Sequence, residues 1–216
     1  MTRFTALLIA LTALVGGAAL LSAQPTPPKA PATDAASQEN LEVATFASGC
    51  FWCTESDFDM VEGVKETISG YMGGKTKNPT YATVSSGKTG HAEVLQIKYD
   101  PTVVSYKKLV EFYWHHVDLL DGGGQFCDRG SQYRPVIFAH TPDQKSIAEA
   151  SKAALDKSGR FDKPIAVEIV EASDFTPAED YHQDYHETHP LKYRYYRYGC
   201  GRDARLQKLW GEEATP

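Results

Sequence analysis

From residue 41 onward, apolar residues recur along the chain with two recognisable periods, that of a strand and that of a helix. Short runs of β-branched and apolar residues, or strict alternation, predict strands over residues 41–47, 64–71, 94–99, 135–140 and 165–171. Apolar residues three and four positions apart predict helices over residues 54–61, 105–117 and 142–157. Because strands and helices interleave, with hairpin-like and crossover connections, the pattern predicts an α+β fold with helices on one side of a mixed sheet.

The predicted fold is a ferredoxin-like plait, and the remaining stretches predict long irregular segments around it. Residues 75–90 and 121–134 are polar and rich in glycine, and loops of this length usually carry function. Residues 176–179 have the spacing of a capping box, which predicts a further helix start. A tyrosine-rich C-terminal extension begins at about residue 192.

The N-terminal pattern indicates a targeting segment. A positive charge at Arg3, an apolar run over residues 6–21 and small residues at 22–23 predict a signal peptide over residues 1–23. Residues 24–40, rich in Pro and Ala, predict a flexible linker before a single catalytic domain over residues 41–216. We therefore expect an exported, periplasmic protein, with an uncleaved N-terminal membrane anchor as the alternative.

The net charge and the spacing of the histidines argue against nucleic-acid binding and against metal binding. The net charge is −6, with acidic and basic residues interspersed, which argues against a nucleic-acid partner. The histidines at positions 140, 182, 186 and 189 follow no metal-binding pattern, so we expect no metal ion. The four cysteines of an exported protein could form two structural disulfides.

Cys50 stands where the first strand ends and the first helix begins. Free N–H groups and the helix dipole favour an anion at that place, so we expect a thiolate with a pKa below the free value of about 8.5. The large apolar side chains of Phe51 and Trp52 would then form a wall for a small substrate group. The alternatives are a buried structural cysteine, a redox pair with Cys53, and a zinc half-site that lacks a second pair.

Glu93 begins the third strand and alternates onto the same face as Leu95 and Ile97. If that face is enclosed, desolvation keeps the carboxyl protonated near neutrality, as a general acid requires. The alternative is a strand-end residue that turns back to water. The glycine-bearing loop over residues 121–134 could bring Asp128 and Tyr133 to the same site; it lacks the lysine of a phosphate-binding loop.

Several motifs taken together resemble those of the A-type peptide methionine sulfoxide reductases. The resemblance runs from about Phe46 to about Tyr185, with the motifs in the family's order. They are Gly49-Cys50-Phe51-Trp52, Gly70-Tyr71-Met72-Gly73-Gly74, Asn78-Pro79-Thr80-Tyr81, Gly90-His91-Ala92-Glu93, Tyr99-Asp100-Pro101 and Asp128-Arg129-Gly130-Ser131-Gln132-Tyr133-Arg134. The family's fold is an α+β plait, in agreement with the pattern above.

The resemblance implies reduction of the S epimer of methionine sulfoxide, free or in proteins. Cys50 would attack the sulfoxide sulfur, and Glu93 would protonate the departing oxygen. The other implied site residues are grouped around that oxygen and the substrate. They are Tyr81 and Tyr133, whose hydroxyls hold the oxygen, Phe51 and Trp52, which receive the methyl group, and Asp128 and His91 in the substrate pocket.

The same resemblance implies that a second thiol recovers the Cys50 sulfenic acid. The chain departs from the best-known members here, because it has Cys53 where glycine is common and Cys200 after a longer tyrosine-rich stretch. We expect Cys200 to resolve the sulfenic acid, since a flexible tail reaches a sulfur more easily than a residue fixed in a helix. Cys53 and Cys127 are the alternatives.

Partners follow from this chemistry. We expect no bound cofactor, electrons from a thioredoxin-like protein or from dithiothreitol in vitro, and oxidised proteins or free methionine sulfoxide as substrates. We expect the enzyme to act as a monomer. The competing classes are a thiol–disulfide oxidoreductase, which would have no need of Glu93, and a non-catalytic reader of oxidised methionine, which would not need Cys50.

Overall fold

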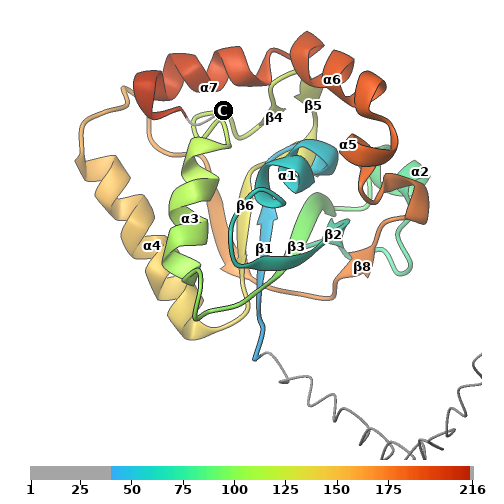
Figure 1. The fold of residues 1–216 in the computed structure, drawn as a ribbon, viewed down its shortest axis with the longest axis horizontal. Coiled ribbons are helices and arrows are strands. Elements are labelled where there is room, and N and C mark those ends of the chain that lie inside the picture. Colours follow the sequence, from blue (N-terminus) through green and yellow to red (C-terminus); the bar gives the residue numbers. More distant parts are fainter. Residues whose placement is uncertain (1–39, 215–216) are drawn as a thin grey trace, which may run out of the picture. The chain divides into compact units, whose positions relative to one another are not determined.

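The structure is a computed structural model that describes residues 40–214 (Figure 1). The predicted signal peptide and residues 24–39 of the predicted linker lie outside the described residues. No helix among residues 40–214 has the length and apolar character needed to cross a membrane.

A six-stranded mixed sheet forms the centre of the fold. The strands run in the order β7 (Glu168–Glu171), β6 (Val136–Ala139), β1 (Glu42–Ala47), β3 (Ala92–Tyr99), β2 (Val64–Met72) and β8 (Thr176–Pro177). β1 pairs antiparallel with both β3 and β6, whereas β6 and β7 are parallel. The predicted α+β class with a mixed sheet is therefore confirmed.

The larger core lies between one face of the sheet and the helices. Its helices are α1 (Phe51–Phe58), α3 (Tyr106–His115), α4 (Pro142–Lys157) and α7 (Arg202–Trp210). Phe46 of β1 stacks on Phe58 of α1 and on Tyr113 of α3, which joins strand and helices in one aromatic cluster. The other face has a smaller cluster, which includes Met72 and Phe138 and packs against Phe175.

The predicted long loops contain short regular elements. The first holds α2 (Tyr81–Val84), capped by the side chain of Thr80. The second holds the hairpin of β4 (Gly124–Gln125) and β5 (Asp128–Arg129), followed by the 3₁₀ turn η1 (Ser131–Tyr133). Both loops are thus held in fixed shapes that present named side chains.

The predicted helix start over residues 176–179 is wrong. Thr176 and Pro177 form β8, which pairs with β2 at the edge of the sheet. Glu179, read from the sequence as a capping residue, instead accepts hydrogen bonds from the Tyr71 hydroxyl and the Tyr81 main-chain N–H, both at 2.9 Å. Long-range partners therefore override the local capping pattern.

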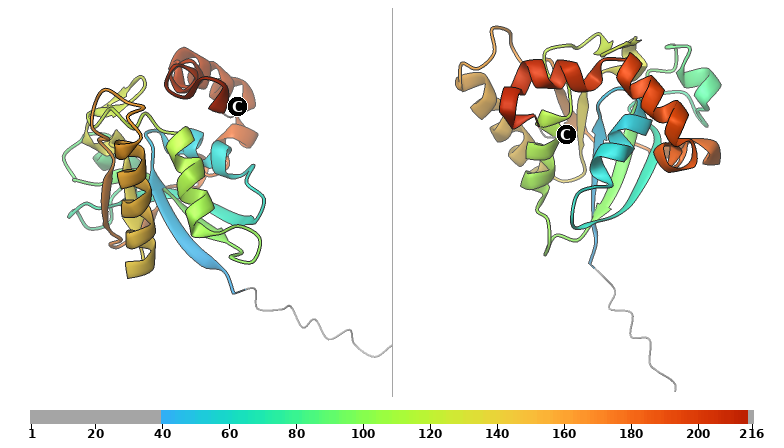
Figure 2. Two further views of the ribbon diagram at one scale, coloured as in Figure 1. Left: turned by 90° about the vertical axis from the view of Figure 1, so that its left-hand side faces the viewer. Right: turned by 45° about the horizontal axis from the view of Figure 1, so that its top comes forward.

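The C-terminal extension is helical and packed, and is not the flexible tail that we expected. After α5 (Tyr185–Thr188), the helices α6 (Pro190–Gly199) and α7 run along one end of the sheet (Figures 1 and 2). Arg202 is fully buried, donates to the carbonyls of Ser48 and His116 at 3.0 and 2.6 Å, and pairs with Asp57 at 3.3 Å. A buried charge of this kind is stable only with such partners, so Arg202 fixes the extension to α1.

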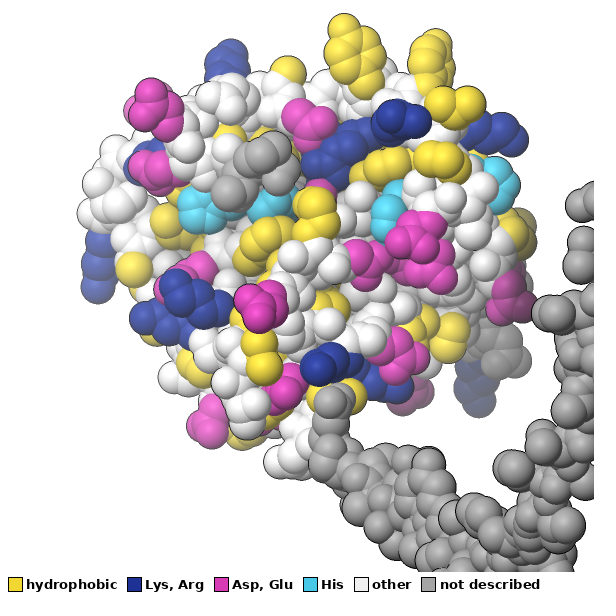
Figure 3. Space-filling view, in the orientation of Figure 1, with side chains coloured by type: hydrophobic (Ala, Val, Ile, Leu, Met, Phe, Trp, Pro, Cys, Tyr) yellow, Lys and Arg dark blue, Asp and Glu magenta, His cyan; other side chains and the backbone are white. Residues whose placement is uncertain are grey.

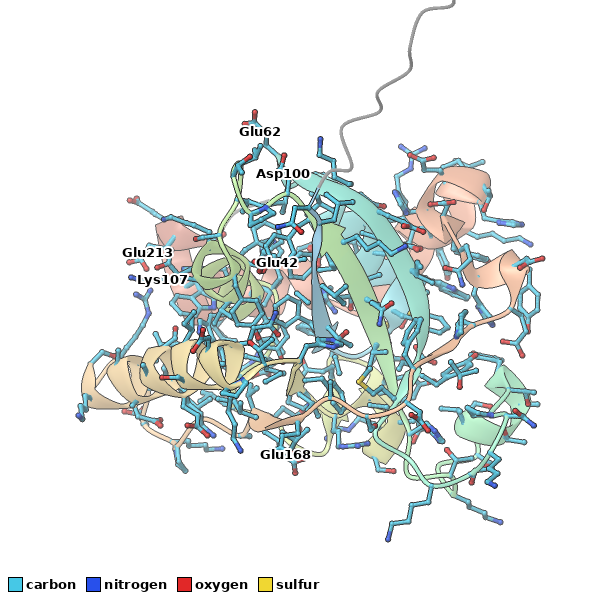
Figure 4. The ribbon with its side chains drawn as sticks, turned by 90° about the horizontal axis from the view of Figure 1, so that it is seen from below. Glu42, Glu62, Asp100, Lys107, Glu168 and Glu213 are labelled. Carbon is cyan, nitrogen blue, oxygen red and sulfur yellow. A yellow bond between two sulfur atoms is a disulfide. The ribbon has the colours of Figure 1, made fainter. Side chains whose placement is uncertain are left out.

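The opposite end of the sheet carries a group of acidic residues. Glu42, Glu62 and Asp100, which are labelled in Figure 4, lie there together. The antiparallel register explains the division, because Glu42 pairs with Tyr99 at that end, whereas Phe46 pairs with Leu95 near the other. β1 therefore delivers Cys50, and the start of β3 delivers Glu93, to the end that α6 and α7 cover.

Candidate active site

Cys50 is the N-cap residue of α1, where the sequence placed it. The chain turns sharply from β1 through Gly49, whose φ of +91° is one that residues with side chains rarely adopt. A Cβ at Gly49 would lie 2.5 Å from Cβ of Gln125, so the turn also needs a residue without a side chain. Cys50 is held with only 7% of its surface exposed.

Glu93 lies beside the start of the same helix. Its side chain is 2% exposed, and its Oε2 accepts a hydrogen bond of 3.1 Å from the main-chain N–H of Phe51. Burial raises the pKa of Glu93 to about 8, and the nearby charge of Asp128 acts in the same direction. The carboxyl is therefore enclosed and neutral near pH 7, as the protonated form of a general acid must be.

The expected lowering of the Cys50 pKa is wrong. Burial raises the pKa of the Cys50 thiol well above its usual range, and its hydrogen bond with Cys53 and the charge of Glu93 raise it further. The pKa of Cys53 is lowered, first by the hydrogen bond with Cys50 and then by the charge of Arg202. The helix-terminus argument considered only the N–H groups and left out the loss of water around the sulfur.

Two tyrosine hydroxyls and one carboxyl lie near this pair. Burial raises the pKa of Tyr81 to about 12, and the charges of Glu93, Cys50 and Asp128 add to the effect. The pKa of Tyr133 is raised by burial and by the same neighbours. Both hydroxyls are therefore neutral donors, and the sequence-predicted Tyr81, Tyr133, Asp128 and Glu93 are brought together around Cys50.

Aromatic rings line the site. Trp52 stacks on Tyr185 with 3.8 Å between the ring centroids, and its indole N–H donates to Nδ1 of His182 at 3.0 Å. His182 is 2% exposed and also lies against the Phe51 ring. The predicted wall of Phe51 and Trp52 is thus completed by His182 and Tyr185, which the sequence reading did not assign to the site.

Tyr196 of α6 is a further residue that the sequence reading missed. Its hydroxyl donates a hydrogen bond to Asp128 and lies in hydrogen-bond contact with the Cys50 sulfur. Its ring meets Trp52 edge to face at 5.8 Å. The density of tyrosines between residues 193 and 198 was a signal, but only the three-dimensional path of α6 selects Tyr196.

The other predicted site residues lie elsewhere or are paired. Cys127 and Cys200 form a disulfide, whereas Cys50 and Cys53 are free and buried. His91 packs against Gly74, and no contact among the described residues joins it to Cys50. Within residues 40–214, only Cys127, Asp128 and Cys200 are grouped closely enough to suggest metal ligands, and two of these three are in the disulfide.

These contacts define a class of protein. The site combines a free cysteine, an adjacent thiol, a neutral carboxylic acid and two hydroxyl donors beside a group of aromatic rings. These are the parts of a thiol-dependent enzyme that also protonates its substrate. The comparisons with known proteins give the family. The peptide methionine sulfoxide reductase model matches residues 42–214, so the chain belongs to this family.

Relatives of known sequence and structure agree. The peptide methionine sulfoxide reductase MsrA of Listeria monocytogenes is 55% identical over 173 residues, which cover 80% of this chain and 98% of the relative. The crystal structure of Mxr1 from Saccharomyces cerevisiae in reduced form is 32% identical, with a TM-score of 0.64 over 69% of this chain and 86% of that one. Methionine sulfoxide reductase A of Corynebacterium diphtheriae is 34% identical, with a TM-score of 0.62 over 71% and 77%.

Proposed function

We propose that this protein reduces the S epimer of methionine sulfoxide, free and in proteins, to methionine by thiol chemistry. The observation that carries the proposal is the enclosed Glu93, whose pKa of about 8 keeps it protonated beside the helix start at Cys50. Sulfoxide oxygen is a poor leaving group until it is protonated, so this pair supplies the two reagents that the reaction needs.

The first step starts from a protonated Cys50 beside Cys53. The lowered pKa of Cys53 makes it the ionised partner of the pair, and the hydrogen bond between the two sulfurs lets Cys53 take the Cys50 proton as Cys50 begins its attack. The resulting Cys50 thiolate attacks the sulfoxide sulfur while Glu93 transfers its proton to the oxygen. Tyr81 and Tyr133 donate hydrogen bonds to that oxygen, which stabilises the charge that develops on it. Methionine leaves, and Cys50 is left as a sulfenic acid.

Cys53 is the thiol that the geometry favours for the second step. Cys200, the residue expected from the sequence, is bonded to Cys127, and Cys53 already contacts the Cys50 sulfur. Cys53 attacks the Cys50 sulfur and passes the proton that it took from Cys50 to the sulfenic hydroxyl, which leaves as water, and a Cys50–Cys53 disulfide forms. The hydrogen bond with Cys50, and then the charges of Arg202 and Arg197, lower the pKa of Cys53, so that it gives up this proton readily.

Substrate binding is assigned to the aromatic rings beside Cys50. The rings of Phe51 and Trp52, held by His182 and Tyr185, form an apolar wall for the S-methyl group. Asp128, oriented by the Tyr196 hydroxyl, is a polar contact at the same site. An apolar wall on one side of the sulfur and donors on the other would select one sulfoxide epimer.

The assay uses purified protein, dithiothreitol and the separate epimers of methionine sulfoxide. We expect methionine from the S epimer only, and none from Cys50→Ser with either epimer. Equal rates with both epimers, or an active Cys50→Ser variant, would refute the proposal. A thiol–disulfide oxidoreductase would show disulfide exchange without methionine and would keep its activity in Glu93→Gln.

Export from the cytoplasm is proposed from the apolar stretch over residues 6–21 alone. The electrons would then come from a thioredoxin-like protein outside the cytoplasm. Fractionation of cells that express the full chain tests this proposal. Recovery of full-length protein from the cytoplasm would remove it.

A further inference from the structure

The helix α2 carries Tyr81, one of the two hydroxyls assigned to the sulfoxide oxygen, but it has only four residues. A single helical turn is not stable by itself, because its first hydrogen bond must fix several residues at once. Val84 is the only residue of α2 that is buried. The position of Tyr81 therefore depends on bonds from other parts of the chain.

Glu179 supplies such a bond at the first residue of α2. Its Oε1 accepts a hydrogen bond from the main-chain N–H of Tyr81, and its Oε2 accepts one from the hydroxyl of Tyr71, both at 2.9 Å. Burial by itself would raise the pKa of Glu179, but the hydrogen bonds from Tyr81 and Tyr71 outweigh it and lower that pKa. The carboxylate is therefore ionised at neutral pH, and both of its oxygens act as acceptors.

Tyr71, the second partner of Glu179, belongs to the rigid part of the site. It is fully buried in β2 and lies directly opposite Glu93 in the pairing of β2 with β3. Its ring packs against that of Phe51, with 6.0 Å between the centroids. Glu179 thus connects the turn that carries Tyr81 to the strand beside Glu93.

Glu179 itself is held on both sides along the chain. The N–H of Ala178 donates to the carbonyl of Ser69 at 2.9 Å, which continues the pairing of β8 with β2. The N–H of His182 donates to the carbonyl of Glu179 at 2.8 Å and closes the turn η2 (Asp180–His182). The His182 ring then lies 4.4 Å from the Tyr81 ring, between centroids. This segment therefore contacts both the main chain and the ring of Tyr81.

The other end of α2 is tied to a different part of the site. Gln132 donates from its Nε2 to the carbonyl of Ser85, the C-cap residue of α2, at 3.2 Å, and Gln132 directly precedes Tyr133. Among the described residues, no hydrogen bond joins Glu179 to the η1 turn that carries Tyr133. The two hydroxyls are thus held by separate links, and Glu179 serves the end of α2 at which Tyr81 lies.

We propose that Glu179 is a positioning residue for the reduction, which holds the Tyr81 hydroxyl where the sulfoxide oxygen develops its charge. This inference rests on the proposed function. Glu179 acts through Tyr81 and transfers no proton. A donor stabilises the transition state only when it is already aimed at the oxygen, and a displacement of about 1 Å can cost about 10²-fold in rate. Loss of the Glu179 link therefore lowers kcat more than it raises KM.

Variants of Glu179 test whether the length of the side chain or its charge matters. Glu179→Ala removes both hydrogen bonds, and Glu179→Asp keeps the charge on a side chain one methylene shorter. With methionine (S)-sulfoxide and dithiothreitol, each should lower kcat by about tenfold and leave KM within about twofold of wild type. Urea denaturation checks that the variants are folded, and Glu179→Asp gives the result if Glu179→Ala does not fold. Unchanged kcat in Glu179→Asp would overturn the proposal.

Glu179→Gln is the conservative variant that should restore the link. Its amide oxygen can accept from the Tyr81 N–H, and its amide nitrogen can donate to the Tyr71 hydroxyl. We expect kcat within about twofold of wild type, since the two bonds and the length of the side chain are kept. A loss as large as that of Glu179→Asp would assign the effect to charge and would overturn the proposal.

A double-mutant cycle separates positioning of Tyr81 from support of the site as a whole. In the Tyr81→Phe background, which lacks the hydroxyl, Glu179→Asp should lower kcat by at most about twofold further. In the Tyr133→Phe background it should still cost about tenfold. Equal losses in wild type and in Tyr81→Phe would overturn the inference, whereas no methionine from wild type would refute the proposed function itself.

Asp180 is the matched control, because it is the next acidic residue along the chain and is exposed. It lines a pocket together with Asp59, Asp184 and Glu187, and Figure 3 shows acidic side chains gathered over the region of β2 and α5. Asp180→Ala changes the net charge as Glu179→Ala does, but it removes no bond to α2, so kcat and KM should stay unchanged. A loss equal to that of Glu179→Ala would assign the effect to the charge of this face and would overturn the proposal.

Discussion

The main-chain N–H of Phe51 donates a hydrogen bond to Oε2 of Glu93 at 3.1 Å, across 42 residues of sequence. Phe51 is the first residue of α1 and follows Cys50 directly, so the bond ties the acid to the peptide that carries the proposed nucleophile. The two reacting groups therefore keep a fixed relation that neither α1 nor β3 could provide alone.

The first prediction concerns the Glu93 proton. The acid form is the active one, so the rate should fall as pH rises through the Glu93 pKa of about 8. Glu93→Gln should lower kcat by about 10²- to 10⁴-fold, because an amide cannot transfer the proton. Measuring kcat/KM against pH for both proteins checks this. If kcat/KM of the variant still falls near pH 8 as in the wild type, that fall belongs to the titration of another group.

The second prediction concerns the hydroxyl donors Tyr81 and Tyr133. Replacing either with phenylalanine removes one hydrogen bond to the departing oxygen and keeps the ring. We expect kcat to fall by about 10- to 100-fold in each variant while KM changes little, since the bond strengthens as charge develops. An increase in KM at constant kcat would instead show that the hydroxyl contributes to binding of the substrate before the reaction and not to the transition state.

The third prediction separates Tyr196 from its neighbour on α6. Contact with the Tyr196 hydroxyl lowers the pKa of Cys50, against the larger raising effect of burial. Tyr196→Phe should therefore raise the Cys50 pKa and slow alkylation of Cys50 by iodoacetamide at alkaline pH. Tyr195→Phe is the matched control, because Tyr195 is exposed on the outer face of the helix. Equal rates for wild type and both variants would rule out the contact in solution.

The fourth prediction concerns a buried acid outside the chemistry. Glu55 of α1 is fully buried, and burial raises its pKa from 4.5 to about 8, with the charges of Asp59 and Asp184 adding to the shift. The folded state thus holds a proton that the unfolded state releases above pH 4.5. Its contribution to stability is complete below that pH and is lost as pH rises through about 8.

Glu55→Gln tests that linkage. The variant should show a free energy of unfolding that declines less steeply between pH 5 and 8, by about 1.4 kcal/mol per pH unit. Urea denaturation across this range measures the slope. Glu62→Gln, which alters an exposed carboxyl after α1, should leave it unchanged. Parallel slopes for wild type and Glu55→Gln would show that Glu55 does not carry the proton.

The sequence predicted the parts of the fold and site that depend on short-range pattern. The alternation over β2 and β3 and the apolar spacing over α3 and α4 identified those elements within a few residues. Cys50 was placed at a helix start because the strand, Gly49 and the helix follow directly in sequence.

Long-range contacts explain what the sequence did not predict. The rise in the Cys50 pKa comes from burial. The helix α6, which covers this end of the sheet, is distant in sequence: its Arg197 lies 140 residues beyond Asp57, the residue of α1 with which it pairs. His182 was passed over because its role depends on contact with Trp52, 130 residues away. The segment around Cys200 was likewise taken for a flexible tail, whereas Arg202 anchors it; the resolving role of Cys200 itself stays a prediction.

The most direct test of the account is a single turnover by enzyme in the state that the structure shows, with Cys50 and Cys53 free and Cys127 bonded to Cys200. Mixed with methionine (S)-sulfoxide and no reductant, wild type should release one methionine per chain, and peptide mapping should find Cys50 bonded to Cys53. Cys50→Ser should release none. Methionine from Cys50→Ser, or a wild-type product in which Cys50 is still a free thiol, would contradict the account.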